Sequence, residues 1–137
     1  MLFRQLFDEE SSTYTYLIGD TQTKEALLID PVKEQVPAYL TLLQQLGYTL
    51  KMAVDTHVHA DHITALGDLR QATSCQTGVG APSTSPCAGW VFQEGDTLQV
   101  GGITLQIWHT PGHTDDSYSF VMEGRVFTGD CLLIRGT

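Results

Sequence analysis

In the first half of the chain, apolar and polar residues follow two different periodicities, one typical of strands and one typical of helices. Alternation from Tyr14 to Ile18, followed after a polar turn by an apolar run at Glu25–Asp30, predicts an antiparallel hairpin. From Lys33 to Leu46 the apolar residues recur instead at helical spacing, with a proline in the first turn and Gly47 placed as a C-terminal cap. A third apolar run at Tyr48–Asp55 predicts another strand. Two strands, a helix and a strand are therefore expected in this order.

Glycine-containing turns punctuate the second half of the chain. A helix is expected over Ile63–Gln71, although Gly67 has low helix propensity. The prolines, serines and glycine of Ala81–Gly89 indicate a loop. Two pairs of strand-like runs follow, and tight turns at Val100–Ile103 and Met122–Arg125 predict that each pair forms a hairpin. Strands, helices and hairpins in this order indicate the α/β fold class.

Composition and charge narrow the class of protein. The 137 residues fit one domain spanning 1–137, and 42% hydrophobic with 17% charged residues is ordinary for a globular protein. The net charge of -9 argues against nucleic acid and against an anionic membrane surface as partners. No apolar stretch approaches membrane-spanning length, and the N-terminus does not resemble a signal peptide. Together with three irregularly spaced cysteines, these features predict a cytoplasmic protein with reduced thiols.

A concentration of metal-binding side chains follows the third predicted strand. Residues 56–62, here called the histidine segment, read Thr-His-Val-His-Ala-Asp-His. Imidazole is the commonest metal-ligating side chain, and crowded imidazoles would repel one another once protonated if no metal held them. The histidine segment therefore predicts a metal site.

Two further fragments supply ligands that one short segment cannot. Thr-Pro-Gly-His-Thr at 110–114 and Thr-Gly-Asp at 128–130 each stand where a strand-like run gives way to a glycine-containing turn. Such positions let a rigid sheet present side chains to a site. The candidate ligands are therefore His57, His59, Asp61, His62, His113 and Asp130.

These residues resemble a known superfamily. His-x-His-x-Asp-His, followed by Pro-Gly-His-Thr and then Thr-Gly-Asp, is the pattern of the metallo-β-lactamase fold. Within that fold, the runs THVHADHITA, TPGHTDDSYSF and FTGDCLLIRGT are similar to the iron-dependent persulfide dioxygenases (sulfur dioxygenases), a branch related to glyoxalase II. The resemblance spans Phe3 to Thr137 and implies the four-layer αββα sandwich of that fold, of which this chain would form the N-terminal part.

The resemblance also implies which residues bind the metal. In the persulfide dioxygenases two histidines and one aspartate hold the iron, and they correspond to His57, His113 and Asp130. Two imidazoles and one carboxylate on one face of Fe(II) leave adjacent positions for substrate sulfur and dioxygen. We therefore expect one Fe(II) per chain. His109 is not part of the family pattern, and we expect it to be a strand-end residue near the site.

Other residues near the ligands are expected to support them. By this resemblance, His59, Asp61 and His62 would orient the ligands, hold waters and tune the iron. Arg135 would help to receive the anionic substrate, with a surface or structural arginine as the alternative. Cys131 is expected to be a small apolar filler, although its thiol would be close enough to the site to make it sensitive to oxidation.

Two reactions remain open for this set of residues. The persulfide dioxygenases oxidise glutathione persulfide with dioxygen, both oxygen atoms end on sulfur, and sulfite and glutathione leave. The alternative is a binuclear zinc hydrolase of the glyoxalase II type, in which a bridging hydroxide cleaves a thioester such as S-lactoylglutathione. Zn(II) binds such ligands more strongly than Fe(II), so ligand type does not decide. In that alternative, His57, His59, His113 and Asp130 would hold one zinc, and Asp61 and His62, with Asp130 bridging, would begin the second site.

The position of the last residue adds a third hypothesis. Members of the family carry a second half after the segment that ends here at Thr137, so we expect a truncated chain that lacks the C-terminal half of the fold. Such a chain would be catalytically silent and would only bind metal or a partner subunit. An exposed sheet edge would also favour self-association, which predicts a homo-oligomer.

Overall fold

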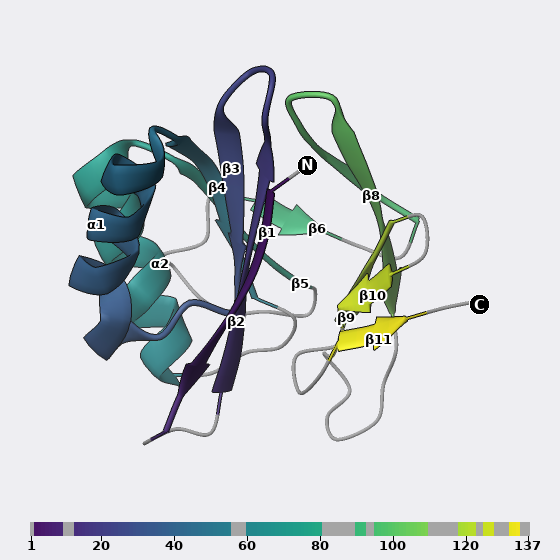
Figure 1. Cartoon of the computed structure of the whole chain (residues 1–137). Helices are drawn as coiled ribbons and strands as arrows, with labels where there is room; N and C mark the ends of the chain where they lie inside the picture. Colours follow the sequence, from purple (N-terminus) through teal and green to yellow (C-terminus); the bar gives the residue numbers. More distant parts are fainter. Residues whose placement is uncertain are drawn as a thin grey trace.

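Two β-sheets pack face to face, and two α-helices cover the outer face of the first sheet (Figure 1). The structure is a computed structural model, and it describes residues 2–9, 13–55, 60–80, 90–92, 95–109, 118–122, 125–127 and 132–134. Within these residues the layers run helix, sheet, sheet, which is the N-terminal part of an αββα sandwich.

The first sheet has six strands in the order β1-β2-β3-β4-β5-β6. The first three strands are antiparallel neighbours, whereas β3 to β6 pair in parallel. Each of the first two parallel connections contains a helix, as expected for strands that must be reached by a crossover. The strands are β1 (Leu2–Asp8), β2 (Thr13–Asp20), β3 (Glu25–Ile29), β4 (Thr49–Val54), β5 (Gln76–Gly80) and β6 (Trp90–Phe92).

The second sheet has five strands in the order β11-β10-β9-β8-β7, and all its neighbours are antiparallel. Successive strands of the chain are neighbours in this sheet, so it is a simple meander. Its strands are β7 (Thr97–Val100), β8 (Ile103–His109), β9 (Tyr118–Met122), β10 (Arg125–Phe127) and β11 (Leu132–Ile134).

Proline sets the start of the first α-helix. The 3₁₀ turn η1 (Lys33–Gln35) leads into α1 (Val36–Leu46), which is followed by Gly47 in the left-handed conformation. Pro37 has no N–H to donate to the carbonyl of Lys33, so that carbonyl accepts from Val36 in the 3₁₀ pattern instead. The second helix, α2, spans Ala60–Thr73. In the described part of the chain, neither helix is long and apolar enough to cross a membrane.

Within the six-stranded sheet, β3 is buried on both faces, which explains its nearly continuous apolar sequence. On β3, Leu27 and Ile29 pack between the two sheets, whereas Ala26 and Leu28 pack against the helices. The same alternation holds on β2. The inter-sheet cluster comprises Tyr16, Ile18, Leu27, Ile29, Met52, Val54, Leu98, Val100, Leu105, Ile107 and Phe120.

The two sheets also meet at the tips of their hairpins. The carboxylate of Asp20, at the end of β2, accepts a hydrogen bond of 2.5 Å from the N–H of Gly102 in the β7–β8 turn. Glu25 Oε1, at the start of β3, accepts from the N–H of Gly101 at 3.0 Å. The two tips lie side by side in Figure 1. We call this the hairpin end of the sandwich.

Most of the elements predicted from the sequence are present, with some corrections. The hairpin of β2 and β3, the Gly47 cap, the strand before the histidine segment and the two later hairpins are confirmed. The helix predicted over Ile63–Gln71 is also confirmed, but it is longer than predicted and starts at Ala60, inside the histidine segment. Alanine has the highest helix propensity, and the sequence after it begins with aspartate, a residue type favoured near helix N-termini. The loop predicted at Ala81–Gly89 lies outside the described residues.

Candidate metal centre

The ends of β4 and β8 lie opposite to the hairpin end. Both β3 and β8 begin at the hairpin end and run away from it. Because β4 is parallel to β3, its last residue, Val54, lies at the opposite end, and so does His109, the last residue of β8. Val54 and Ile107 belong to one core cluster that joins the two sheets. The chain therefore enters both the histidine segment and residues 110–117 from the same end of the sandwich.

The later strands of the second sheet bring a third segment to this end. His109 pairs with Tyr118, the first residue of β9. Phe127, the last residue of β10, pairs with Leu132, the first residue of β11, and also with Phe120 on β9. The segments that carry the three sequence motifs thus all start from strand ends at one end of the molecule. The ends of strands are where sheets commonly present ligand-binding groups.

The predicted iron ligands His57, His113 and Asp130 lie outside the described residues. The histidine segment joins β4 to α2, the segment with the second motif joins β8 to β9, and the third motif joins β10 to β11. Asp61 and His62 belong to the first turn of α2, but the structure does not describe their side chains. The roles assigned to them stay predictions. Outside the described residues are His57, His59, His113, Asp130, Cys131 and Arg135.

Asp55 carries a buried carboxyl group directly before the histidine segment, where the sequence predicts only the end of a strand. It follows β4 directly and is 0% exposed, and its N–H donates to the carbonyl of Gly78 on β5. Burial raises the pKa of the Asp55 carboxyl well above its ordinary value. A nearby cation would oppose that shift, since an opposite charge favours the ionised form. The sequence does contain a signal for Asp55 as a residue of the site: it is an acidic residue between an apolar strand and a histidine cluster.

A second buried acidic residue, Asp30, lies at the same end of the sheet and binds the backbone of β4. Asp30 follows β3, is 0% exposed and has a φ of 57°, in the left-handed region that non-glycine residues rarely adopt. Its N–H donates to the carbonyl of Val54 at 2.8 Å, and its own carbonyl accepts from the Thr15 hydroxyl at 2.7 Å. The last residue of β4 is thereby held from the β3 side.

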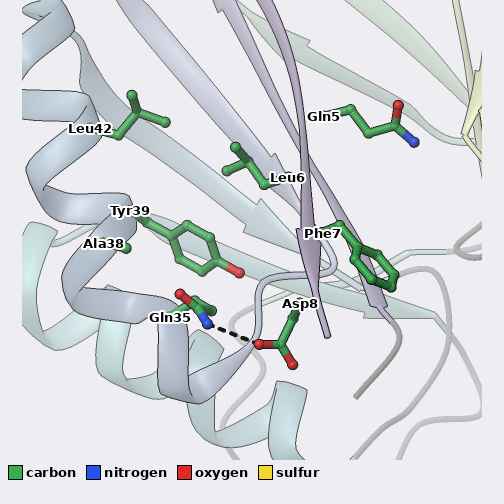
Figure 2. A pocket seen from close by; sticks show the side chains of 8 residues that line it. All are labelled: Gln5, Leu6, Phe7, Asp8, Gln35, Ala38, Tyr39 and Leu42. Carbon is green, nitrogen blue, oxygen red and sulfur yellow. Dashed lines mark hydrogen bonds between the residues drawn. The ribbon is translucent and has the colours of Figure 1, made fainter. Parts of the chain in front are cut away.

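Figure 2 shows a pocket on the helix side of the first sheet. It lies between β1 and α1, with the Tyr39 ring on the helix side and a hydrogen bond of 2.9 Å from Gln35 Nε2 to Asp8 Oδ1. Its lining contains no candidate metal ligand. The pocket therefore does not correspond to the predicted metal site.

Comparison with known proteins identifies the family. The sequence pattern of the metallo-beta-lactamase superfamily matches residues 8–137. This chain belongs to that superfamily. It is 45% identical over 139 residues to the protein named "Persulfide dioxygenase ETHE1, mitochondrial" from Bos taurus, covering 99% of this chain and 54% of that protein. It is 33% identical to a hydroxyacylglutathione hydrolase from Rhodopseudomonas palustris, covering 90% of this chain and 49% of the relative.

A solved structure agrees with the fold. The crystal structure of ETHE1 from Myxococcus xanthus superimposes with a TM-score of 0.89 at 53% sequence identity, covering 100% of this chain and 60% of that one. The expectation of a metallo-β-lactamase fold similar to the persulfide dioxygenases is therefore confirmed. The chain spans about half the length of the curated relatives it matches.

The chemistry of the candidate ligands fits a divalent metal ion. Two imidazoles and a carboxylate form the set that binds Fe(II) in oxygenases, and a fuller set of imidazoles and carboxylates suits zinc. The buried carboxyl of Asp55 adds an acidic group where the chain enters the histidine segment. A cation at this end of the sandwich is thus compatible with both the candidate ligands and the described residues around them.

Proposed function

We propose that this chain carries the metal centre of a non-haem Fe(II) persulfide dioxygenase that oxidises glutathione persulfide. The reaction converts glutathione persulfide, dioxygen and water into glutathione, sulfite and two protons, and both atoms of dioxygen end on the outer sulfur. The proposed ligands are His57, His113 and Asp130, which bind one Fe(II) ion per chain.

The observation that supports this proposal most strongly is the convergence of the three motif segments. Their flanking strand ends lie at one end of the sandwich, so ligands distant in sequence can reach one ion. The 45% identity to the bovine persulfide dioxygenase favours the dioxygenase over other activities of the superfamily. Identity to the hydroxyacylglutathione hydrolase is lower, at 33%.

The chain's own residues would bind, orient and shield the reactants. An Fe(II) ion in this site would supply open coordination positions for the persulfide sulfur and for dioxygen. Holding the two reactants side by side replaces an improbable encounter in solution. His59, Asp61 and His62 would fix the orientation of the ligand side chains, and Arg135 would receive the anionic part of glutathione.

Dioxygen uptake tests the proposal directly. Protein purified without oxygen and loaded with Fe(II) should consume dioxygen when glutathione persulfide is added, and sulfite should accumulate. The zinc-loaded protein is the control and should consume none, because zinc does not undergo redox chemistry. Absence of iron-dependent uptake would contradict the proposal.

The zinc hydrolase is the second candidate, supported by similarity to the hydroxyacylglutathione hydrolase. It uses two zinc ions and a bridging hydroxide, and it would hydrolyse S-lactoylglutathione without consuming dioxygen. Thioester hydrolysis by the zinc-loaded protein, with no dioxygen uptake by the iron-loaded protein, would select this candidate. A chain that binds metal but performs neither reaction would correspond to the third hypothesis.

The location and assembly state are also proposals. The cytoplasmic location and the homo-oligomer expected from the sequence remain predictions, and the bovine relative is named as a mitochondrial protein. Fractionation of cells that express the chain, and sedimentation of the purified protein, would test the two.

A further inference from the structure

Asp30 has a left-handed backbone conformation that neighbouring residues stabilise through hydrogen bonds. Asp30 is fully buried and sits between β3 and η1 with a φ of 57°. Such a conformation persists in a residue with a side chain only where the surroundings enforce it, and it is often found near functional sites. Its N–H donates to the carbonyl of Val54, the last residue of β4.

Two hydroxyl groups hold the backbone at Asp30 from the helix side of the first sheet. The Thr15 hydroxyl on β2 donates to the Asp30 carbonyl at 2.7 Å and lies 3.0 Å from the Tyr39 hydroxyl. Since the single proton of Thr15 is already used on Asp30, Tyr39 must donate its own proton to Thr15. The Tyr39 oxygen in turn accepts the N–H of Val32 at 3.0 Å. Every proton in this network therefore has an assigned acceptor.

Tyr39 reaches the network from α1. Figure 2 shows its side chain extending from the helix toward the strands, and the residue is only 4% exposed. Burial raises the pKa of its hydroxyl, so the group keeps the proton that it donates. The network thus connects α1 and β2 with the loop that follows β3.

The same network ends where the chain turns into the histidine segment. The carbonyl of Val54 accepts from Asp30 on one side, and the N–H of Asp55 donates to Gly78 on the other. The next residue, Thr56, begins the histidine segment. The last two described residues before the histidine segment are therefore held by Asp30 on one side and by β5 on the other.

We propose that Thr15 and Tyr39 are positioning residues for the metal centre. Their hydroxyl groups hold Asp30 in its left-handed conformation, Asp30 holds Val54, and Val54 sets the path of the chain into the histidine segment. Neither residue is a metal ligand, and the inference rests on the metal site of the proposed function. Losing groups that orient metal ligands costs about tenfold to a hundredfold in affinity or activity.

The variants Tyr39→Phe and Thr15→Val test the inference, because each removes a hydroxyl and nearly preserves shape. Thr15→Ser keeps the hydroxyl and should behave as the original protein. Thr73→Val is the matched control: the Thr73 hydroxyl donates to the Leu69 carbonyl and accepts from the Cys75 N–H, but at the opposite end of α2 from the histidine segment. It also removes a partly buried hydroxyl with two partners.

Two measurements separate positioning from a general loss of stability. The first is titration with Co(II), whose absorption spectrum reports ligand geometry. We expect Tyr39→Phe and Thr15→Val to bind Co(II) about tenfold more weakly with an altered spectrum, and Thr15→Ser and Thr73→Val to match the original protein. The second is hydrogen exchange, which should speed up at residues 54–62 in the same two variants, with or without metal.

The outcomes are distinct for the inference and for the proposed function. Variants that melt at a lower temperature but keep the original Co(II) affinity, spectrum and exchange at residues 54–62 would show a purely structural role and overturn the inference. If the original protein bound no Co(II), the exchange measurement alone would decide the inference. Faster exchange at residues 54–62 in Tyr39→Phe and Thr15→Val would support it, and unchanged exchange would overturn it. Absence of dioxygen uptake with normal Co(II) binding would reject the dioxygenase and leave the inference standing.

Discussion

Asp20 shows how one side chain can join two sheets. Its carboxylate accepts the N–H of Gly102 across the sandwich and the N–H of Gln22 within its own turn, at 2.5 and 2.8 Å. Gly101 next to it is in the left-handed conformation, and an added Cβ would collide with Thr23 and Asp20. The close approach of the two hairpin tips therefore needs both the carboxylate and the absence of a side chain.

This contact should make stability depend on pH below the neutral range. The hydrogen bond from Gly102, followed by that from Gln22, lowers the pKa of Asp20 from its ordinary value of 3.8. A lowered pKa in the folded state means that the ionised group stabilises the fold above the unfolded pKa, and that this contribution is lost as pH falls through the folded pKa. Asp20→Asn should therefore be less stable than the original protein at about pH 6. The difference should shrink below about pH 4.

Urea denaturation at a series of pH values measures this difference. Glu34→Gln, which removes the same charge from an exposed position in η1, should differ from the original protein by less than about 0.5 kcal/mol throughout. A gap between Asp20→Asn and the original protein that stayed constant from pH 6 to about pH 3 would contradict the assignment.

At the scale of the elements, two glycines of the helices have opposite roles. Gly47 follows α1 with a φ of 77° and its N–H satisfies carbonyls of the last turn, whereas Gly67 lies inside α2. An added Cβ would meet nothing within 4 Å at either position. Any difference between alanine substitutions at these sites must therefore come from the backbone and not from collisions.

The two alanine substitutions should shift stability in opposite directions. Gly67→Ala should stabilise the protein by about 0.5–1 kcal/mol, because alanine loses less backbone entropy in a helix. Gly47→Ala should destabilise it by about 1–2 kcal/mol, because an L side chain disfavours the left-handed conformation. The free energy of unfolding from urea denaturation checks both values. Two changes of the same sign would contradict this explanation.

The strained corner at Asp30 belongs to the same scale, because it lies where β3, η1 and β4 meet. A left-handed non-glycine residue costs about 1–3 kcal/mol, which the surrounding structure must offset. Here the offset comes from hydrogen bonds contributed by β2, β4 and α1. An element boundary near the histidine segment is thus held by three neighbouring elements at once.

For the whole molecule, metal binding should be coupled to folding. A ligand that binds only the folded chain stabilises it by about 2.7 kcal/mol at a concentration one hundred times its dissociation constant. Fe(II) added without oxygen should therefore raise the melting temperature of the original protein. His57→Ala, His113→Ala and Asp130→Ala should each lose iron occupancy and most of that rise, because each removes a proposed ligand.

His109→Ala provides the control for these variants. His109 ends β8 next to the second motif but is not part of the ligand pattern, so this variant should keep its iron and its metal-dependent rise in melting temperature. Full iron occupancy in all three ligand variants, measured by metal analysis after gel filtration, would refute the assignment of the ligands.

The arrangement of the molecule also explains how far the sequence could be interpreted. Local periodicity was enough to predict the β2–β3 hairpin, the α1 helix with its Gly47 cap, β4 and the Gly-Gly turn of β7 and β8, because each is encoded within a short stretch. It did not predict β1, β5, β6 and β11 as strands. Strands β1, β6 and β11 lie at sheet edges and owe their conformation to neighbours elsewhere in the chain, which a local pattern does not contain. Strand β5 lies inside its sheet, but its two glycines have low strand propensity.

By itself the sequence determined the fold family and the residue types that could bind a metal, because motif spacing and side-chain chemistry are properties of the chain. Only the tertiary structure decided that the three motif segments start from one end of the sandwich, since strand pairing joins residues far apart in sequence. It alone also revealed the hydrogen bonds of Thr15, 15 residues from Asp30 and 24 from Tyr39, and the contact of Asp20 with Gly102, 82 residues away. Such contacts depend on folding in three dimensions, and no local pattern of polar and apolar residues encodes them.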